Sequence, residues 1–346
     1  MTRATVLIPT HHAPESLSAA VESALAQTVS DIEILIVGDG VGEGYRQIIE
    51  DCIARDPRVR FLDLPKGANR GERNRHEGVL AARSEVIAYL ADDDLLLPRH
   101  LDNVLDMLAD ADICQPFNGY IDRHDQLCLL PADLADPAWH AWHLLEPPRN
   151  RVSITGTAHT RAAYLRLPRG WDLAAPGMPT DLTLWRQFFA LDGLRGRTHT
   201  ELTVLQLPAS ERAHLDAEAQ TAQRERWTRF LAAPEAHDAL QELVRDAMRR
   251  EHLAWNPLIF DLIIARDELQ EAVRLHRESA ELAAAEAQQL AERAAQLEAA
   301  AAAAGEESSR LRAELDATRA TLSWRVTAPL RAVRQLVDRS STPRED

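Results

Sequence analysis

The first 120 residues alternate short apolar runs with amphipathic helical patterns, and this alternation limits the folds that the chain can adopt. The apolar runs are rich in β-branched residues and lie at 5–8, 32–37, 59–62, 86–90 and 112–117. A helical pattern separates each of the first four runs from the next, and the first of these patterns covers about residues 15–26. Strands that alternate with helices are typical of βαβ units and a mainly parallel sheet. The sequence therefore predicts an α/β fold for this part of the chain.

Three consecutive carboxylates, Asp92, Asp93 and Asp94, follow the fourth of these predicted strands. Three like charges repel one another unless solvent or a cation compensates them, and Mg²⁺ and Mn²⁺ prefer such oxygen ligands. A solvated acidic turn is the alternative for an isolated run of this kind. Ligands of open α/β sheets lie at the carboxyl ends of the strands. We therefore expect Thr10, Asp39 and the Asp triplet to converge on one crevice.

Glycines at 38, 40, 42 and 44 follow the second predicted strand, but their spacing does not give a dinucleotide-binding GxGxxG motif. We interpret this segment as a flexible loop. Asp39 lies within it and has two interpretations. Its carboxylate can accept hydrogen bonds from a base or a ribose, or it can form a turn.

A basic patch interrupts the acidic sequence at residues 65–75. Its cations are Lys66, Arg70, Arg73 and Arg75. Guanidinium groups can hold phosphate oxygens or the edge of a base. The alternative is a solvated helix start in which these residues pair with Glu72 and Glu77.

The composition excludes some classes of function. A formal net charge of −15 argues against a nucleic-acid binder, which usually carries a basic surface. Three cysteines without a CxxC pair indicate neither a disulfide framework nor a cysteine zinc site, which fits a reducing compartment. The sequence shows no signal-peptide pattern and no apolar stretch of the roughly 20 residues that a membrane span needs. We expect a cytoplasmic protein, soluble or peripheral at the inner face of the membrane.

The second half of the chain changes character. Glycine and proline interrupt residues 152–206, where one helix is predicted at 182–190, and nearly everything beyond 208 has a helical pattern. A seven-residue repeat runs through 269–322. One seam carries Val273, Ala280, Ala287, Ala294, Ala301, Ser308, Leu315 and Leu322, and the other carries Leu269, Ala283, Leu290, Leu297, Ala304 and Leu311. Alanine buries little area, and Gly305 weakens the helix. A weak dimer, a long solvated helix and one strand of a larger assembly all remain open.

Residues 323–346 predict an amphipathic tail. Leu330, Val333, Leu336 and Val337 share one helical face, and Arg331 and Arg334 lie away from it. A basic amphipathic helix can lie on an anionic membrane surface, which would give a peripheral contact. Packing on the protein itself is the alternative.

Several motifs in order resemble the family 2 glycosyltransferases of the GT-A fold, over roughly residues 4–200. The matching segments are the first strand at 6–10, the helix end at 23–28, the second strand at 33–39, the pair Arg73-Asn74, the Asp triplet within 91–98, the run Gly170-Trp171-Asp172 and residues 180–185. The chain departs from the family pattern at Gly38, at His11-His12, at Ala91 and at Thr180. Residues 323–331 also resemble tails that follow coiled coils in bacterial surface-polysaccharide transferases.

This resemblance implies an activity. A sugar would move from a nucleotide-diphosphate donor to a hydroxyl of a glycan or lipid-linked acceptor, with inversion at the anomeric carbon, in bacterial surface polysaccharide synthesis. The implied cofactor is Mn²⁺ or Mg²⁺, held by Asp93 and Asp94, with Asp92 as the alternative second ligand. Asp181 would be the general base; without the resemblance, it would be interpreted as a helix cap.

The resemblance also implies binding residues for both substrates. Those for the nucleotide sugar are Pro9, Thr10, His11, Asp39, Lys66, Arg73, Asn74 and Asp92. Trp171 and Asp172 are expected on the acceptor side. Trp171 would stack on a sugar ring, although core packing is the commoner fate of a tryptophan.

The expected domain organisation has four parts. A GT-A domain at 1–207 would place its nucleotide-sugar half at about 1–120 and its acceptor half at about 121–207. A helical extension at 208–265, a long helix or coiled coil at 266–322 and the tail at 323–346 would follow. The coil is the expected site of any homo-oligomer.

Two other functions compete with sugar transfer. The chain would be a scaffold if the domain has lost turnover and the long helix assembles partners, and the departures at Gly38, Ala91 and Thr180 keep that interpretation open. A nucleotidyltransferase would also use Asp-bound metal, but the first strand has no phosphate-cradling glycine motif.

Overall fold

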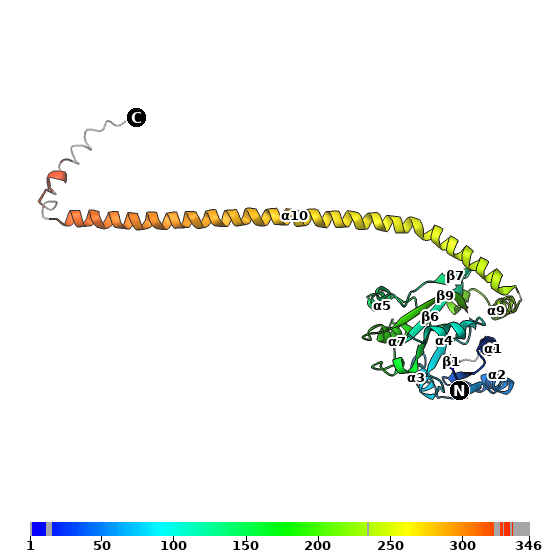
Figure 1. Cartoon of the computed structure of the whole chain (residues 1–346). Coiled ribbons are helices and arrows are strands. Elements are labelled where there is room, and N and C mark those ends of the chain that lie inside the picture. The colour runs from blue at the N-terminus through cyan, green and yellow to red at the C-terminus, as the bar shows by residue number, and fades with distance from the viewer. Residues whose placement is uncertain are drawn as a thin grey trace. The chain divides into compact units, whose positions relative to one another are not determined.

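The computed structural model describes residues 2–11, 16–233, 235–321, 326–327, 329–332 and 334. The chain divides into two compact units, Met1–Asn256 and Pro257–Asp346. The first unit contains a nine-stranded mixed sheet with helices on both faces (Figure 1).

The predicted parallel strands are present and form one side of this sheet. They are β1 (Ala4–Thr10), β2 (Ile32–Gly38), β3 (Val59–Leu62) and β4 (Val86–Tyr89). Their order is β3-β2-β1-β4, with Thr10 opposite Gly38 in the register of β1 and β2. The carboxyl ends of β1, β2 and β4 therefore meet at one edge, as the α/β prediction requires.

The other side of the sheet is mixed. The predicted run 112–117 lies in β6 (Ile113–Ile121), which pairs with β7 (Leu127–Leu130), β8 (Ala158–Thr160) and β9 (Gly196–Gln206). β8 is antiparallel to both β4 and β6, and β5 (Leu95–Leu96) is antiparallel to β9. The sequence did not predict β9, because its first six residues are partly or fully exposed and mostly polar, so only its second half has an apolar pattern.

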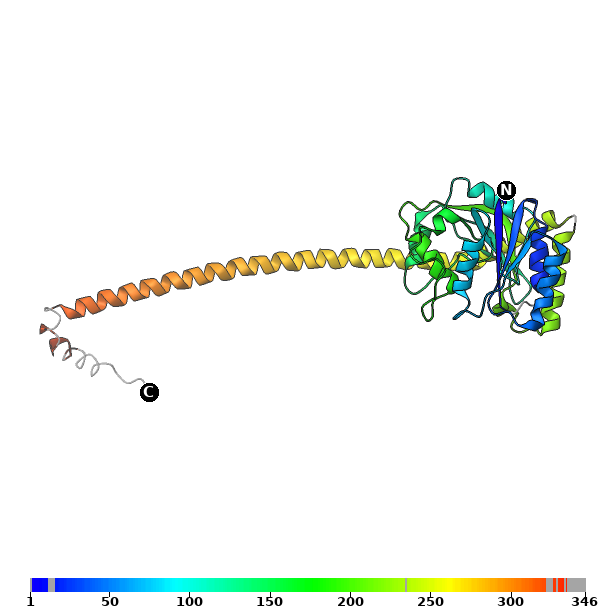
Figure 2. The same cartoon turned by 90° about the horizontal axis from the view of Figure 1, so that it is seen from below.

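Helices cover the two faces of the sheet because successive strand residues point to opposite sides. Val6 and Ile8 of β1 pack in one apolar cluster with α1 (Ser16–Leu25), α2 (Glu43–Arg55) and α4 (His100–Met107). Leu7 packs in the other cluster with α3 (Glu72–Ala81), α5 (Pro137–Leu144), α6 (Arg161–Tyr164) and α7 (Thr180–Phe189). Figure 2 shows helices on both sides of the strands.

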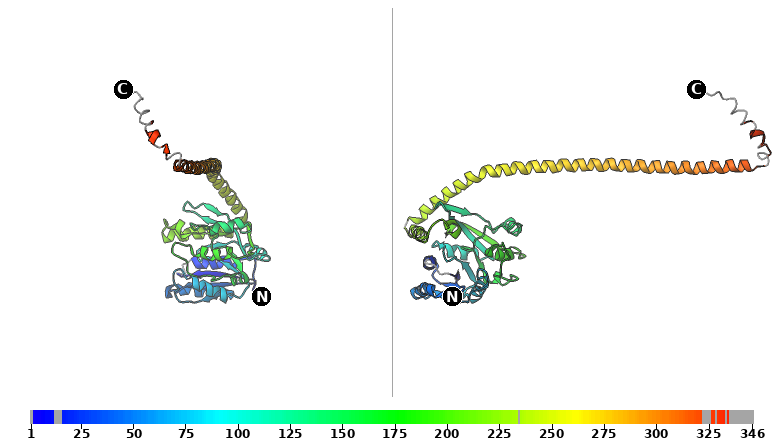
Figure 3. Two further views of the ribbon diagram at one scale, coloured as in Figure 1. Left: turned by 90° about the vertical axis from the view of Figure 1, so that its left-hand side faces the viewer. Right: turned by 180° about the vertical axis from the view of Figure 1, so that it is seen from behind.

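The chain then becomes helical, as predicted, with α8 (Ala209–Arg212), α9 (Ala217–Ala232) and α10 (Ala236–Ala320). The start of α10 belongs to the first unit: Leu240 and Ala247 are buried, and Glu251 accepts a 2.8 Å hydrogen bond from the backbone N–H of Leu129. Figure 3 shows α10 from two further directions.

The second unit contains the rest of α10, whose 85 residues run without a break through 265–266, where a domain boundary is expected. Most of the predicted tail at 323–346, including Val333, Leu336 and Val337, lies outside the described residues. Among the helices that are described, none combines the length and apolarity of a membrane span.

Candidate active site

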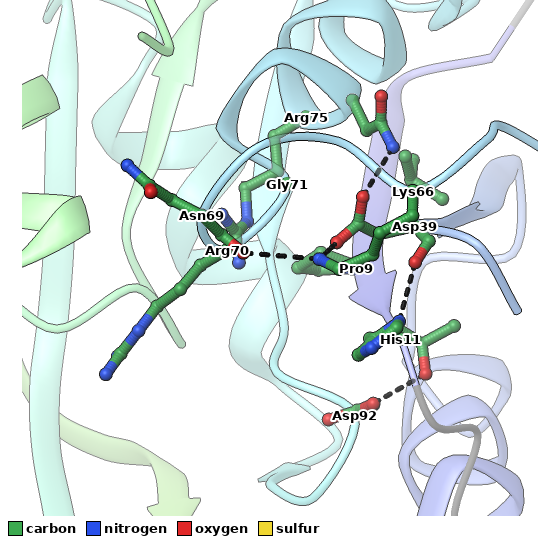
Figure 4. Close-up of a pocket in the computed structure, with 12 residues that line it drawn as sticks. Pro9, His11, Asp39, Lys66, Asn69, Arg70, Gly71, Arg75 and Asp92 are labelled. Atoms are coloured by element: carbon green, nitrogen blue, oxygen red, sulfur yellow. Dashed lines mark hydrogen bonds and ion pairs between the residues drawn. The ribbon is translucent and has the colours of Figure 1, made fainter. Parts of the chain in front are cut away.

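A cavity of about 310 Å³ lies at the carboxyl ends of β1, β2 and β4. It is lined by Pro9, Thr10, His11, Val37, Asp39, Lys66, Asn69, Arg70, Gly71, Asn74, Arg75 and Asp92. Segments far apart in the sequence therefore meet here, with Asp39, His11 and Asp92 around one space (Figure 4). Seven of the eight residues predicted to bind a nucleotide sugar line this cavity; the exception is Arg73.

Asp39 fixes the loop that closes one side of the cavity. Its Oδ1 accepts 2.7 Å hydrogen bonds from the backbone N–H of Gly67 and from Nδ2 of Asn74, and its Oδ2 pairs with Lys66. Gly71 has a φ of +74°, and a Cβ there would lie 2.5 Å from Cγ of Asp39. Only glycine fits this close approach. Asp39 is therefore both a cavity-lining residue and the anchor of the loop.

Arg75 supplies a cation to the same cavity. Its Nε and Nη1 are buried without a hydrogen-bond partner in the described structure, and its guanidinium lies 5.2 Å from the ring centre of Trp171. Burial lowers the pKa of Arg75, an effect that Glu72, Asp39 and Asp181 oppose. A buried donor without a partner costs about 1–3 kcal/mol, and more when charged. The site therefore holds an unsatisfied cation suited to an anionic ligand.

Arg73, which the resemblance implies as a nucleotide-sugar-binding residue, does not line the cavity. The side chain of Arg73 is 75% exposed, and its nearest acid is Asp172, at 3.9 Å. Arg75 lies four residues before the buried Val79 on α3, so both face inward, whereas Arg73 does not share that face. Both arginines belong to the basic patch at 65–75, and helical spacing distinguishes Arg75 from the exposed Arg73.

The Asp triplet splits into three environments, and of the three only Asp92 lines the cavity. Asp92 accepts a 2.6 Å hydrogen bond from the Thr10 hydroxyl, and burial, with the charge of Asp93, raises its pKa to about 6. Asp93 accepts a 2.8 Å hydrogen bond from Arg212, whose side chain is only 4% exposed. Burial also raises the pKa of Asp93, against the charge of Arg212. Nothing in the local sequence indicated Arg212, because it comes from a distant helix.

Asp94 points into the protein. Its Oδ1 accepts a 2.7 Å hydrogen bond from the backbone N–H of Leu207, and its Oδ2 accepts a 2.5 Å bond from the Thr155 hydroxyl. Burial and the charge of Asp93 raise its pKa to about 8, which favours the neutral acid at pH 7. The predicted metal role of Asp94 does not fit this geometry. It instead links the Asp turn to the end of β9.

The remaining pair fits a divalent cation that is shared with a substrate. No group of three or more His, Cys, Asp or Glu side chains within the described residues could hold a metal alone. Mg²⁺ commonly takes only one or two carboxylates and completes its shell with water and substrate phosphates. Asp92 lines the cavity and Asp93 follows it on the same turn, where Oδ2 of Asp93 is held by Arg212; the two carboxylates match that donor set in kind.

Asp181 lies in the first turn of α7. Its Oδ2 accepts a 3.0 Å hydrogen bond from Nδ2 of Asn150, and its Oδ1 accepts a 2.9 Å bond from the backbone N–H of Leu182. The Oδ1 of Asn150 accepts from the N–H of Val152, which fixes the orientation of the Asn150 amide. Burial raises the pKa of Asp181, and Arg75 is among the charges that oppose this. Asp181 therefore satisfies one backbone N–H in the first turn of α7, whose N-cap is Pro179, and its carboxylate interacts electrostatically with Arg75 of the cavity.

Trp171 is a core residue, contrary to the predicted stacking on an acceptor sugar. It is 2% exposed, and its Nε1 donates a 2.9 Å hydrogen bond to the hydroxyl of Tyr89. The Tyr89 hydroxyl lies 2.8 Å from Nε2 of His159, whose Nδ1 lies 3.0 Å from the carbonyl of Thr160. Burial lowers the pKa of His159 to about 4, so the ring is neutral at pH 7. This hydrogen-bonded chain holds the tryptophan face on which Arg75 rests.

The predicted acceptor residue Asp172 is less buried than Trp171. Its carboxylate lies 3.9 Å from both Arg73 and Arg169, and its side chain is 26% exposed.

Comparisons with known proteins agree with this architecture. The model of the family described as Glycosyl transferase family 2 matches residues 5–166. Residues 5–166 therefore match a family 2 glycosyltransferase domain, and the mixed sheet with flanking helices is the arrangement expected of a GT-A fold.

Three curated relatives show the range of similar proteins. An uncharacterized glycosyltransferase, EpsJ, of Bacillus subtilis is 34% identical over 26% of this chain and 25% of its own length. The succinoglycan biosynthesis protein ExoO of Rhizobium meliloti is 32% identical over 31% of this chain and 30% of its own. A chondroitin synthase of Pasteurella multocida is 32% identical over 27% of this chain and 9% of its own. The chain thus spans a third or less of these relatives.

Solved structures are more distant. The crystal structure of TarS from S. aureus is 11% identical, with 72% of each chain covered and a TM-score of 0.46. The mannosyltransferase PcManGT from Pyrobaculum calidifontis, solved with GDP-Man and Mn²⁺, is 16% identical over 59% of this chain and 56% of its own, with a TM-score of 0.41.

Proposed function

We propose that the chain transfers a sugar from a nucleotide-diphosphate donor to a hydroxyl of a glycan or lipid-linked acceptor. The observation that carries this proposal is the convergence of Asp39, Asp92 and the unsatisfied Arg75 on one cavity at the end of the parallel strands. Such a cavity offers hydrogen-bond acceptors for a nucleoside and a cation for a diphosphate. The name of the relative ExoO, a succinoglycan biosynthesis protein, supports a bacterial polysaccharide as the product.

Donor binding divides between the two sides of the cavity. Pro9, Thr10, His11 and Asp39 receive the base and ribose, and Lys66 moves from Asp39 towards the phosphates or stays as its counter-charge. Arg75 donates to diphosphate oxygens through the nitrogens that have no partner in the described structure. Binding energy from the nucleotide is then available to position the reacting carbon.

Asp92 and Asp93 are the residues that would hold Mn²⁺ or Mg²⁺. The ion, when bound, offsets the charge that develops on the leaving diphosphate. The bond from the anomeric carbon to the phosphate oxygen breaks as the bond to the acceptor oxygen forms on the opposite face. Asp181 accepts the proton that the acceptor hydroxyl loses, a role usually worth on the order of 10²- to 10⁴-fold in rate.

Asp172 contributes to the acceptor side through its partly exposed carboxylate, and Trp171 contributes indirectly through Arg75. We place the reaction in the cytoplasm, at the inner face of the membrane if the acceptor is a lipid. The free thiols Cys52, Cys114 and Cys128 support a reducing compartment.

A donor screen tests this function. The full chain is incubated with a panel of nucleotide sugars, with and without Mn²⁺, and thermal shift and slow donor hydrolysis are recorded for each. If the chain transfers a sugar, one nucleotide sugar should raise the melting temperature of the protein and be slowly hydrolysed, and Mn²⁺ should strengthen both effects. Binding that depends neither on the identity of the sugar nor on the metal would contradict sugar transfer and favour a scaffold function.

A further inference from the structure

The second unit carries a helix whose apolar residues have no cover. Every described residue from 257 to 321 is exposed, including Leu269 at 66%, Leu290 at 69% and Leu297 at 65%. Isolated helices gain little stability from propensity alone, and most helical stability in proteins comes from packing an apolar face. We therefore expect the exposed, regularly spaced leucines of this 85-residue helix to pack against a partner.

The apolar seam begins earlier than the repeat at 269–322 suggested. Because α10 is continuous, the same heptad extends back to Ile259 and Leu262. Its a positions are Ile259, Arg266, Val273, Ala280, Ala287, Ala294, Ala301, Ser308 and Leu315. Its d positions are Leu262, Leu269, His276, Ala283, Leu290, Leu297, Ala304, Leu311 and Thr318. Bulky residues thus dominate the start of the seam, whereas in its middle part alanine fills the a positions and only Leu290 and Leu297 are large.

The charges beside this seam identify the partner. In a parallel, in-register pair of helices, each g residue faces the e residue five positions later on the other helix. Both members are charged in the pairs Arg293–Glu298, Glu307–Arg312 and Glu314–Arg319, and every one of these pairs joins opposite charges. The first g–e pair, Leu258–Ile263, is apolar on both sides. We propose that the seam binds a second copy of this chain as a parallel, in-register two-stranded coiled coil.

Ion pairs within α10 are too weak to prevent the g–e pairs between two copies. Glu307 lies 2.5 Å from Arg310, and Arg319 lies 3.9 Å from Asp316, both as exposed pairs one turn apart. Such pairs contribute only a few tenths of a kcal/mol. Within the described residues, Arg293, Glu298 and Arg312 take part in no ion pair.

The seam residues select two strands and one register. β-Branched residues at a with leucine at d favour dimers, and the chain has Ile259 with Leu262 and Val273 with Leu269. Arg266 at an a position is a polar residue of the kind that fixes register at some cost in stability. The alanine segment lets two helices approach closely but buries little area. Phe260 and Ile264 lie at b and f, off the seam.

Charge reversal in the full chain tests the pairing. Wild type should have twice the 38.6 kDa mass of one chain by sedimentation equilibrium. One variant carries Arg293→Glu, Arg312→Glu and Arg319→Glu, and a second carries Glu298→Arg, Glu307→Arg and Glu314→Arg. Each variant alone places like charges at every charged g–e pair, so the dissociation constant of its dimer should rise about a hundredfold. A 1:1 mixture should restore a dimer that contains one chain of each kind.

Arg274→Glu is the control, because Arg274 lies at b, off the seam, and its ion pairs are with Glu271 and Glu278; this variant should remain dimeric. A monomeric wild type at micromolar concentration would overturn the proposal. Dimers of undiminished stability in both charge-reversed variants would also overturn it, and a trimer would overturn the two-stranded assignment.

Cysteine cross-linking tests the direction. Ala280→Cys and Ala301→Cys, made singly in the full chain, should both form interchain disulfides under mild oxidation, because a positions meet across a parallel dimer. In an antiparallel pair, at most one of the two cysteines could lie opposite its own copy on the other helix. Wild type and the outward-facing Ala285→Cys serve as blanks. Cross-linking at one site only, or at neither, would contradict the in-register parallel arrangement. This result is independent of sugar transfer, since none of these residues lies in the first unit.

Discussion

At the residue scale, the most consequential side chain is Arg75. Its guanidinium is buried against Trp171 with two nitrogens lacking a hydrogen-bond partner in the described structure, an arrangement that costs free energy in the absence of ligand. A folded protein tolerates that cost when binding recovers it. The site is therefore preorganised for an anion before the donor arrives.

Replacing this cation should separate binding from stability. Arg75→Met should weaken binding of a nucleoside diphosphate by about 10- to 100-fold, because one or two charge-assisted hydrogen bonds are lost. Its thermal stability should be maintained or raised, since an unpaired buried charge is removed. Isothermal titration calorimetry and a thermal melt measure the two effects. Arg73→Met, at an exposed site on the same helix, is the matched control, and equal loss in both variants would exclude the special role of Arg75.

Asp181 carries the predicted proton transfer. Asp181→Asn should lower the transfer rate by about 10²- to 10⁴-fold while nucleotide affinity stays within a few-fold of wild type, because the amide keeps the shape but accepts no proton. Initial rates and a nucleotide titration provide the comparison. A parallel loss of rate and affinity would mean that the residue holds the helix or the donor instead.

Asn150 should tune that base. Burial already raises the pKa of Asp181, so activity should fall, as pH decreases, at a pH above the ordinary range for aspartate. The hydrogen bond from Asn150 favours the charged carboxylate, so Asn150→Ala should move this acid limb of kcat/KM to still higher pH. Asn103→Ala, which removes contacts to His199 and Glu201 instead, is the control. A loss of rate that is the same at every pH, with the acid limb of kcat/KM at its wild-type position, would indicate a merely structural role for Asn150.

At the element scale, the loop that follows β3 depends on one glycine. Gly71→Ala would place a Cβ 2.5 Å from Asp39 Cγ at a φ of +74°, a conformation that costs other residues roughly 1–2 kcal/mol. We expect a less stable protein with weaker nucleotide binding, measured by chemical unfolding and calorimetry. Gly44→Ala is the matched control, because nothing lies within 4 Å of its Cβ position on α2. Wild-type affinity in Gly71→Ala would show that Asp39 does not need this loop.

The sequence predicted those elements whose pattern is local. The strands β1 to β4 and their shared edge follow from apolar runs and turns, so Thr10, Asp39 and Asp92 could be placed together in advance. β9 was missed because its polar half lies where the sheet is partly exposed, and apolar periodicity does not report hydrogen-bonded strands of that kind. The GT-A class came from the order of several motifs.

Long-range contacts could not be obtained in the same way. Arg212 reaches Asp93 across 119 positions in sequence, and Asn150 reaches Asp181 across 31. Consecutive aspartates also gave no indication that Asp94 would turn inward to Leu207. Burial decides these roles, and it depends on segments that pack only in the folded chain.

At the scale of the whole molecule, the two units divide the work. The first unit gathers Lys66, Arg70 and Arg75 at one cavity in a chain with a net charge of −15, which favours an anionic ligand at that edge of the sheet. The second unit offers a seam with complementary charges for another copy. Assembly and chemistry can therefore be altered by separate substitutions, such as Arg312→Glu and Asp181→Asn.

The most direct measurement is a crystal structure of the full chain with Mn²⁺ and the nucleotide sugar that the donor screen selects. We expect the base and ribose against Asp39 and His11, with the diphosphate between Arg75 and a metal at Asp92 and Asp93. A nucleotide bound elsewhere, or a diphosphate that leaves Arg75 without a partner, would contradict it.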